Sequence, residues 1–205
     1  MIQVLTAITG AVAVANAAFE RRPARYVLKP LASAGFVAVA VSSGAGDTAY
    51  GRWILAGLVL GAIGDLALLR SDDRSFLVGL GSFLLGHLAY VVGFLQVPIG
   101  GWAVAAAGGT VLGMASWRWL DRHVRSPMRV PVGAYVAVIT TMLVVALASW
   151  PERMLGTVGA ILFTASDLAV ARERFVAPSR WNPRVGLPLY HGGRILFALS
   201  TAAVV

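Results

Sequence analysis

The sequence predicts an all-α, polytopic membrane protein, a bundle of about eight transmembrane helices. Of its 205 residues 58% are hydrophobic and 13% are charged, and the mean hydropathy is +0.78. A soluble core of this length could not bury so much apolar side chain. Apolar windows long enough to cross about 30 Å of hydrocarbon as a helix recur along the chain, and no alternating strand pattern is present. Helices are therefore the expected spanning elements.

Eight apolar windows account for most of the chain, and they lie near residues 2–18, 27–43, 51–69, 75–95, 100–119, 131–149, 153–171 and 185–204. The first window has arginines after it and no basic residue before it, which is the reverse of a signal peptide, so we expect a retained span. No linker or low-complexity tract separates the windows. Residues 1–205 are expected to form a single domain.

The connections between the windows alternate in charge. All but three of the 17 lysines and arginines lie in or beside the first, third, fifth and seventh connections. The positive-inside rule then places these connections in the cytoplasm and both termini on the other side of a cell (inner) membrane. Basic residues spread between apolar runs also favour contact with anionic lipids, and we expect no nucleic-acid partner.

Two spans repeat the phrase Asp-Leu-Ala-x-x-Arg, from Asp65 to Arg70 and from Asp167 to Arg172. Each aspartate lies about 7 Å along its helix from the arginine, so the two carboxylates share one depth. Ionised groups are rare within spans and usually face a cavity or a partner. Two of them in matched positions predict one shared polar site, and we take Asp65 and Asp167 as its candidate catalytic pair.

Two further polar residues can line a cavity with these carboxylates, and a third lies deeper in the last span. Lys29 enters the second span from the basic side, and Tyr190 lies roughly 9 Å past Arg184 in the last span. Arg194 falls near the middle of the membrane, where an unpaired guanidinium is too costly. We therefore expect Arg194 to contact Asp65, Asp167 or a lipid phosphate.

Structural roles are the alternative interpretation. The two aspartates could only neutralise Lys29 and Arg194, although buried ion pairs are weak sources of stability. His87 and Tyr90 could bond a neighbouring helix, and Ser166 could bond the carbonyl one turn earlier. The sequence has no cysteine, and its three histidines lack metal-ligand spacing. We expect no metal and no other cofactor.

The order and spacing of several short motifs resemble the YhhN/TMEM86 family of membrane proteins over nearly the whole chain; the motifs are Lys29-Pro30, Gly64-Asp65, Phe83 with Gly86-His87 and Tyr90, Ser166-Asp167 and Tyr190. Characterised members are lysoplasmalogenases, which hydrolyse the vinyl ether of lysoplasmalogens to a fatty aldehyde and a glycerophospho-alcohol. Arg194 stands where the family usually has Gln. The resemblance implies an active site for a lysophospholipid substrate at Lys29, Asp65, His87, Tyr90, Ser166, Asp167 and Tyr190.

Vinyl ether hydrolysis suits these residues. Protonation of the alkene carbon gives an oxocarbenium ion, which water captures before the hemiacetal collapses. A carboxyl beside a second carboxylate in a low-dielectric site can be protonated near neutral pH, and the second then stabilises the cation or activates water. Either Asp65 or Asp167 could be the acid. Lys29 or Arg194 is expected to hold the phosphate.

Two other classes of function compete with this hydrolase. Intramembrane aspartates, an arginine and glycine-rich helices are equally typical of a small transporter coupled to protons or solutes. A structural or lipid-binding membrane protein would use the charges only to pair its helices. Solute flux without bond cleavage would indicate a transporter. A structural role would be indicated if swapping Asp167 and Arg194 with each other left every measured property unchanged.

Overall fold

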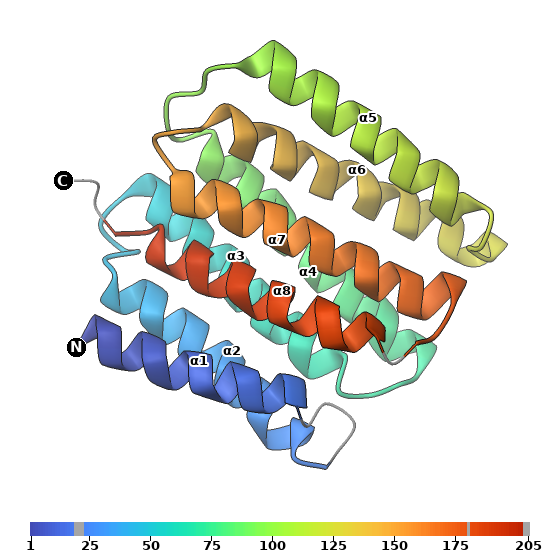
Figure 1. The fold of residues 1–205 in the computed structure, drawn as a ribbon, viewed down its shortest axis with the longest axis horizontal. Helices are drawn as coiled ribbons and strands as arrows, with labels where there is room; N and C mark the ends of the chain where they lie inside the picture. The colour runs from blue at the N-terminus through green and yellow to red at the C-terminus, as the bar shows by residue number, and fades with distance from the viewer. Residues whose placement is uncertain (19–22, 180, 203–205) are drawn as a thin grey trace.

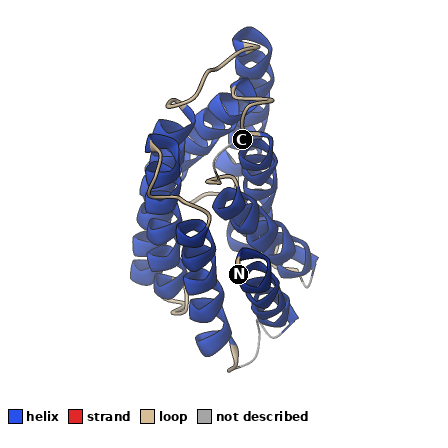
Figure 2. Ribbon diagram, turned by 90° about the vertical axis from the view of Figure 1, so that its left-hand side faces the viewer, coloured by secondary structure: helices blue, strands red, loops and turns tan. Residues whose placement is uncertain are grey.

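The computed structural model describes residues 1–18, 23–179 and 181–202, which form eight α-helices and one π-helical segment, η1 (Figure 1). The view turned by 90° shows helices and loops and no strand among these residues (Figure 2). The predicted all-α class is confirmed. Arg21, Arg22 and Arg180, which contribute to the charge pattern, lie outside the described residues. The elements are α1 (Ile2–Ala18), α2 (Arg25–Ser42), α3 (Ala49–Ala67), α4 (Asp73–Phe94), α5 (Trp102–Asp121), α6 (Ser126–Ala148), α7 (Met154–Ala171), η1 (Arg172–Val176) and α8 (Trp181–Leu199).

Each predicted window corresponds to one helix, and the largest differences are in α6 and α8. Helix α6 begins at Ser126, five residues before the predicted start, with Pro127 in its first turn. A proline is tolerated there because its missing N–H has no partner at that position in any helix. Helix α8 is displaced toward the N-terminus and runs from Trp181 to Leu199 instead of 185–204.

Four helical segments are long and apolar enough to cross a membrane: α3, α4, α6 and the continuous stretch Met154–Val176. Helix α1 is apolar but has 17 residues. Large apolar side chains cover the outside of the bundle, where Val104 and Val130 are each 81% exposed. Such an apolar exterior matches a lipid environment and not water. Several membrane-spanning helices are thus a property of the fold, and the count of eight crossings stays a prediction.

The helices run roughly parallel or antiparallel to one another (Figure 1). Consecutive helices pack as pairs, α1 with α2, α3 with α4, α5 with α6 and α7 with α8. Helix α8 is central, because it also contacts α1, α2 and α3. Helix α5 lies at the edge of the bundle and packs chiefly against α6. This arrangement brings the charged faces of α2, α3 and α8 together.

Two glycines of α3 make room for large side chains from other helices. A Cβ atom at Gly57 would lie 2.2 Å from the Tyr90 ring, and one at Gly61 would lie 2.7 Å from the Arg194 guanidinium. Both contacts are too short for any larger residue to fit unless the neighbour moves. The Gly57–Gly61 spacing therefore serves close packing, as expected of small residues four apart in a membrane helix.

The loop between α3 and α4 is fixed by an N-terminal cap. Asp72 accepts hydrogen bonds from the Ser75 backbone N–H at 2.9 Å and from the Ser75 hydroxyl at 2.8 Å. These bonds, together with the nearby Arg70, lower the pKa of Asp72 to about 2. The charged cap holds the start of α4 beside the end of α3.

Candidate active site

Asp65 is the centre of a buried charged cluster. It lies on α3, is 2% exposed, and accepts hydrogen bonds from the Ser33 hydroxyl at 2.6 Å and the Tyr190 hydroxyl at 2.5 Å. The Arg194 Nη1 atom donates to the same oxygen, Oδ2, at 3.1 Å. Lys29 Nζ lies 3.5 Å from the other oxygen, Oδ1. Asp65 thus joins α2, α3 and α8, with two cations beside one carboxylate.

Helical spacing explains how α2 and α8 supply these groups. Lys29 and Ser33 are four residues apart on α2, and Tyr190 and Arg194 are four apart on α8. Residues at this spacing lie on the same face of a helix, one turn apart. Arg194 also donates to the Tyr190 hydroxyl and to the carbonyl of Leu58. The guanidinium is 0% exposed, so its charge is balanced entirely within the protein.

Asp167 has a different environment on α7. The Tyr135 hydroxyl of α6 donates to its Oδ2 at 2.6 Å, and the His87 Nε2 atom of α4 lies 3.6 Å from the same oxygen. The side chain of Asp167 is 18% exposed. No lysine or arginine among the described residues lies within ion-pair distance of Asp167, in contrast to Asp65.

The backbone contact of His87 fixes which of its ring nitrogens carries the proton. Nδ1 lies 2.6 Å from the carbonyl oxygen of Phe83, and only an N–H can donate to that acceptor. In the neutral ring Nε2 is then an acceptor, and none of the residues that the structure describes hydrogen bonds to it. Nε2 and a carboxylate oxygen would both be acceptors, so their approach favours a proton held by the His87–Asp167 pair.

Both carboxylates line one cavity of about 650 Å³. The rings between the two clusters are in contact, since the Phe163 centroid lies 5.3 Å from that of Tyr190 and 5.0 Å from that of His87. Arginines line the cavity at the end of the bundle where α2 begins and α3 ends, and η1 contributes an arginine and Glu173; this end is called the basic mouth. The interior wall of the cavity is largely apolar. Lining residues at the mouth include Arg25, Arg70 and Arg174, and those of the apolar wall include Leu80, Leu112, Ile139 and Leu143.

The structure brings most of the sequence-predicted site residues to this cavity, but not all of them. The residues that line it are Lys29, Asp65, Ser166, Asp167 and Tyr190. His87 lies behind Asp167, and Arg194 lies behind Asp65; neither is among the described residues that line the cavity. Tyr90 stacks on Phe197 with ring centroids 4.3 Å apart and is 2% exposed, so it packs between helices.

Two residues of the site were missed in the sequence. Ser33 hydrogen bonds to Asp65, and Tyr135 lines the cavity and hydrogen bonds to Asp167. A signal for each is present in the sequence. Ser33 follows Lys29 by one helical turn, and Tyr135 is the only tyrosine in an otherwise apolar span. Spacing alone does not say which carboxylate either residue serves.

An all-helical bundle with several apolar spans and two carboxylates at a partly apolar cavity defines a polytopic membrane protein with a lipid-sized internal site. The chain belongs to the YhhN family, whose family model matches residues 24–201. No solved structure matches it.

Three curated relatives of the chain are each named as a lysoplasmalogenase. Lysoplasmalogenase TMEM86A of Bos taurus is 31% identical over 156 residues, which are 72% of this chain and 64% of the relative. Lysoplasmalogenase of Mycobacterium tuberculosis (strain CDC 1551 / Oshkosh) is 29% identical over 146 residues, 68% of this chain and 55% of the relative. Lysoplasmalogenase TMEM86B of Mus musculus is 30% identical over 167 residues, which are 78% of this chain and 67% of the relative. The chain spans just under two thirds of the bovine relative and about half of the mycobacterial one.

Proposed function

We propose that this protein is a membrane lysoplasmalogenase-like hydrolase. It cleaves the vinyl ether bond of a lysoplasmalogen to a fatty aldehyde and a glycerophospho-alcohol. One observation carries the proposal: Asp65 and Asp167, with unlike surroundings, line a single cavity that has a basic mouth and an apolar wall. The names of the relatives support the reaction and the substrate class.

The two carboxylates take different roles in this proposal. Lys29 and Arg194 flank Asp65, so its anionic form is electrostatically balanced. Asp167 faces a tyrosine and an imidazole, and no lysine or arginine of the described part of the chain lies beside it. Asp167 is therefore the group that carries a transferable proton, and Asp65 stays charged. This division between two carboxyl groups is the one that glycoside hydrolysis uses around a similar oxocarbenium ion.

The reaction begins when protonated Asp167 gives its proton to the alkene carbon that does not bear oxygen. The π electrons form the new C–H bond, and the ether oxygen shares a lone pair with the neighbouring carbon, which becomes an oxocarbenium ion. Water adds to that carbon and returns a proton to Asp167. The hemiacetal then collapses: its hydroxyl loses a proton as the carbonyl forms, the C–O bond to the glycerophospho-alcohol breaks, and the leaving oxygen takes up a proton, so the aldehyde and the alcohol are both neutral at that bond. Water is the only co-substrate consumed.

The cavity orients an amphipathic substrate for this step. Lys29 is 8% exposed at the cavity wall and is the cation best placed for the substrate phosphate. The arginines of the mouth extend that positive region outward. Leu112 and Leu143 lie in the apolar part, where the hydrocarbon chain is held. Arg194 orients Asp65 and Tyr190 from behind instead of touching lipid.

We further propose the membrane topology that the charge pattern predicts. All eight helices cross the membrane, both termini face away from the cytoplasm, and residues 1–205 form one YhhN-like transmembrane domain of the cell (inner) membrane. The position of Arg25, Arg70 and Arg174 at one end of the bundle supports this orientation, because basic residues collect on the cytoplasmic side. Cysteine accessibility at Gly46 and Ser71 variants, on opposite sides in this topology, tests it.

The proposed activity is tested with purified protein in lipid nanodiscs and a lysoplasmenyl lipid, measuring fatty aldehyde. Asp167→Asn should lower the rate at least about 100-fold, the usual range for lost general acid catalysis. Asp65→Asn should also lower the rate, because it removes the anion that stabilises the oxocarbenium ion. Asp121→Asn, a carboxylate paired with Arg129 outside the cavity, is the matched control and should be unchanged. Normal rates in both cavity variants would refute the mechanism. Solute flux without cleavage would favour a transporter instead.

A further inference from the structure

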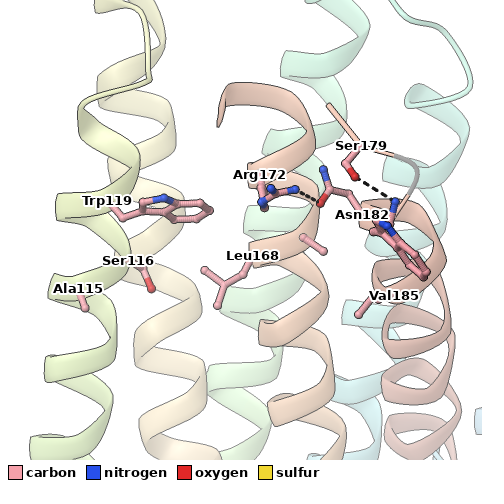
Figure 3. A pocket seen from close by; sticks show the side chains of 10 residues that line it. Ala115, Ser116, Trp119, Leu168, Arg172, Ser179, Asn182 and Val185 are labelled. Atoms are coloured by element: carbon pink, nitrogen blue, oxygen red, sulfur yellow. Dashed lines mark hydrogen bonds between the residues drawn. The ribbon is translucent and has the colours of Figure 1, made fainter. Parts of the chain in front are cut away.

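A second hollow, of about 660 Å³, opens on the side of the bundle between α5, α7 and α8 (Figure 3). Trp119 reaches into it from α5 and Leu168 from α7, while Asn182 and Val185 approach from α8. Helix α5 packs chiefly on α6 and not on α7. The space between α5 and α7 is therefore bounded by side chains and not by direct helix packing. This side opening is not used by the mechanism above.

The side opening and the active-site cavity have a common wall. Four residues line both spaces: Ser116, Leu168, Ala169 and Asn182. Three of the four, Ser116, Ala169 and Asn182, have small or polar side chains. Asp167, the proposed acid, lines the inner cavity, and the residue after it on α7, Leu168, lines both spaces.

The outer rim of the side opening has the chemistry of a membrane interface. Trp119 near the end of α5 and Trp181 at the start of α8 lie on it, and indole rings prefer the headgroup level. Arg172 is exposed and donates from Nη1 to the Asn182 side chain at 2.7 Å. Its other N–H groups have no acceptor among the described residues and can meet a phosphate. Below the rim the walls are apolar.

We infer that the side opening is the lateral entrance through which a lysophospholipid passes from the lipid layer into the cavity. The phosphate meets Arg172 at the rim while the single hydrocarbon chain slides between α5 and α7. This inference rests on the proposed function for the identity of the lipid. The water-soluble product leaves by the separate basic mouth, because that mouth opens at the end of the bundle and not into its lipid-facing side.

A reversible block of the entrance tests this route. The chain has no cysteine, so a single introduced thiol is labelled without background. Ala115→Cys and Val185→Cys place the thiol at residues that line the side opening and not the inner cavity. A benzyl methanethiosulfonate adduct should lower kcat/KM for a long-chain lysoplasmenyl lipid in nanodiscs by about tenfold, equivalent to about 1.4 kcal/mol. Reduction of the adduct should restore activity, which excludes misfolding.

Two controls make the result specific. Val104 lies on α5, the helix of Ala115, is 81% exposed and lines neither space. The adduct of Val104→Cys should therefore leave the rate unchanged. A short-chain, water-soluble vinyl ether lysolipid reaches the cavity through the basic mouth, and its cleavage should not respond to the adducts. Equal losses for both lipids, or no loss for either, would overturn the lateral route.

A binding measurement separates this inference from the proposed reaction. A saturated alkyl-ether lysophospholipid has no vinyl ether to cleave, and it should slow labelling of Ala115→Cys but not of Val104→Cys. If the protein releases no aldehyde yet this protection is found, the proposed reaction fails and the lateral entrance is supported. If aldehyde is released normally, and neither the adducts nor the ether lipid have any effect at Ala115→Cys, the lateral entrance is refuted while the proposed reaction stands.

Discussion

The Tyr135 hydroxyl donates a 2.6 Å hydrogen bond to Asp167, and it joins α6 to the carboxylate that pairs with no lysine or arginine among residues 1–18, 23–179 and 181–202. Asp65 has two cations beside it instead. The contrast between the two carboxylates is the basis for assigning Asp167 as the acid and Asp65 as the anion.

Removing the Tyr135 hydroxyl should therefore affect the chemical step more than substrate binding. In Tyr135→Phe, Asp167 loses the one hydroxyl that orients it, so kcat should fall about tenfold, with little change in KM. Steady-state kinetics of aldehyde release measure this. Tyr90→Phe, whose ring packs outside the cavity, is the matched control and should keep kcat. A rise in KM at constant kcat for Tyr135→Phe would place this tyrosine in lipid binding.

Lys29 should act mainly on affinity for the anionic headgroup. Replacing it by methionine keeps the bulk of the chain but removes a charge-assisted contact, which is worth about 1.5–3 kcal/mol. KM for a lysoplasmenyl phospholipid should rise at least about tenfold. Lys29→Arg keeps the charge and should recover most of the affinity. An unchanged KM in Lys29→Met would show that the phosphate is held elsewhere.

Arg194 should contribute to stability through Asp65. In Arg194→Leu the buried carboxylate loses one of its two cations, and breaking a buried pair typically costs about 3–5 kcal/mol. Arg194→Gln, which restores the residue usual in the family, keeps an N–H donor for Asp65 and should be less destabilising. Thermal unfolding in detergent compares the two variants. Equal stability of Arg194→Leu and the parent protein would contradict an ion pair at this position.

The glycine beside Arg194 offers a test of packing. A methyl group at Gly61 would lie 2.7 Å from Arg194 Nη1, so Gly61→Ala should shift the guanidinium away from Asp65 and lower both stability and activity. Gly81→Ala on α4 meets open space and is the control. It should be neutral or more stable by about 0.5–1 kcal/mol, because alanine favours a helix. If Gly61→Ala and Gly81→Ala have the same stability and activity, the close contact between Gly61 and Arg194 is contradicted.

The sequence predicted the helices well because apolar length and charged connections are local properties. It also predicted that Arg194 would contact an aspartate or a lipid phosphate, since an unpaired charge at that depth is too costly. It did not reveal that Asp65 takes both cations while Asp167 faces Tyr135 and His87. That difference depends on how α6, α7 and α8 are rotated about their axes, which tertiary packing decides and a single span's periodicity does not.

The lining of the cavity was likewise beyond the sequence. His87 and Arg194 were expected to touch substrate, and each instead lies behind a carboxylate. Their depth in the membrane could be counted from the span ends. Their direction around the helix relative to an unseen cavity could not, because the position of that cavity depends on how several helices far apart in the sequence pack together.

The most direct test of the proposed mechanism is aldehyde formation in D₂O by the parent protein and by Asp167→Asn. The parent protein should release aldehyde carrying one deuterium on the carbon next to the carbonyl, trapped by immediate reduction. Asp167→Asn should release almost none while still binding the saturated alkyl-ether lysolipid. Deuterated aldehyde formed by Asp167→Asn at the parental rate would contradict a proton delivered by Asp167.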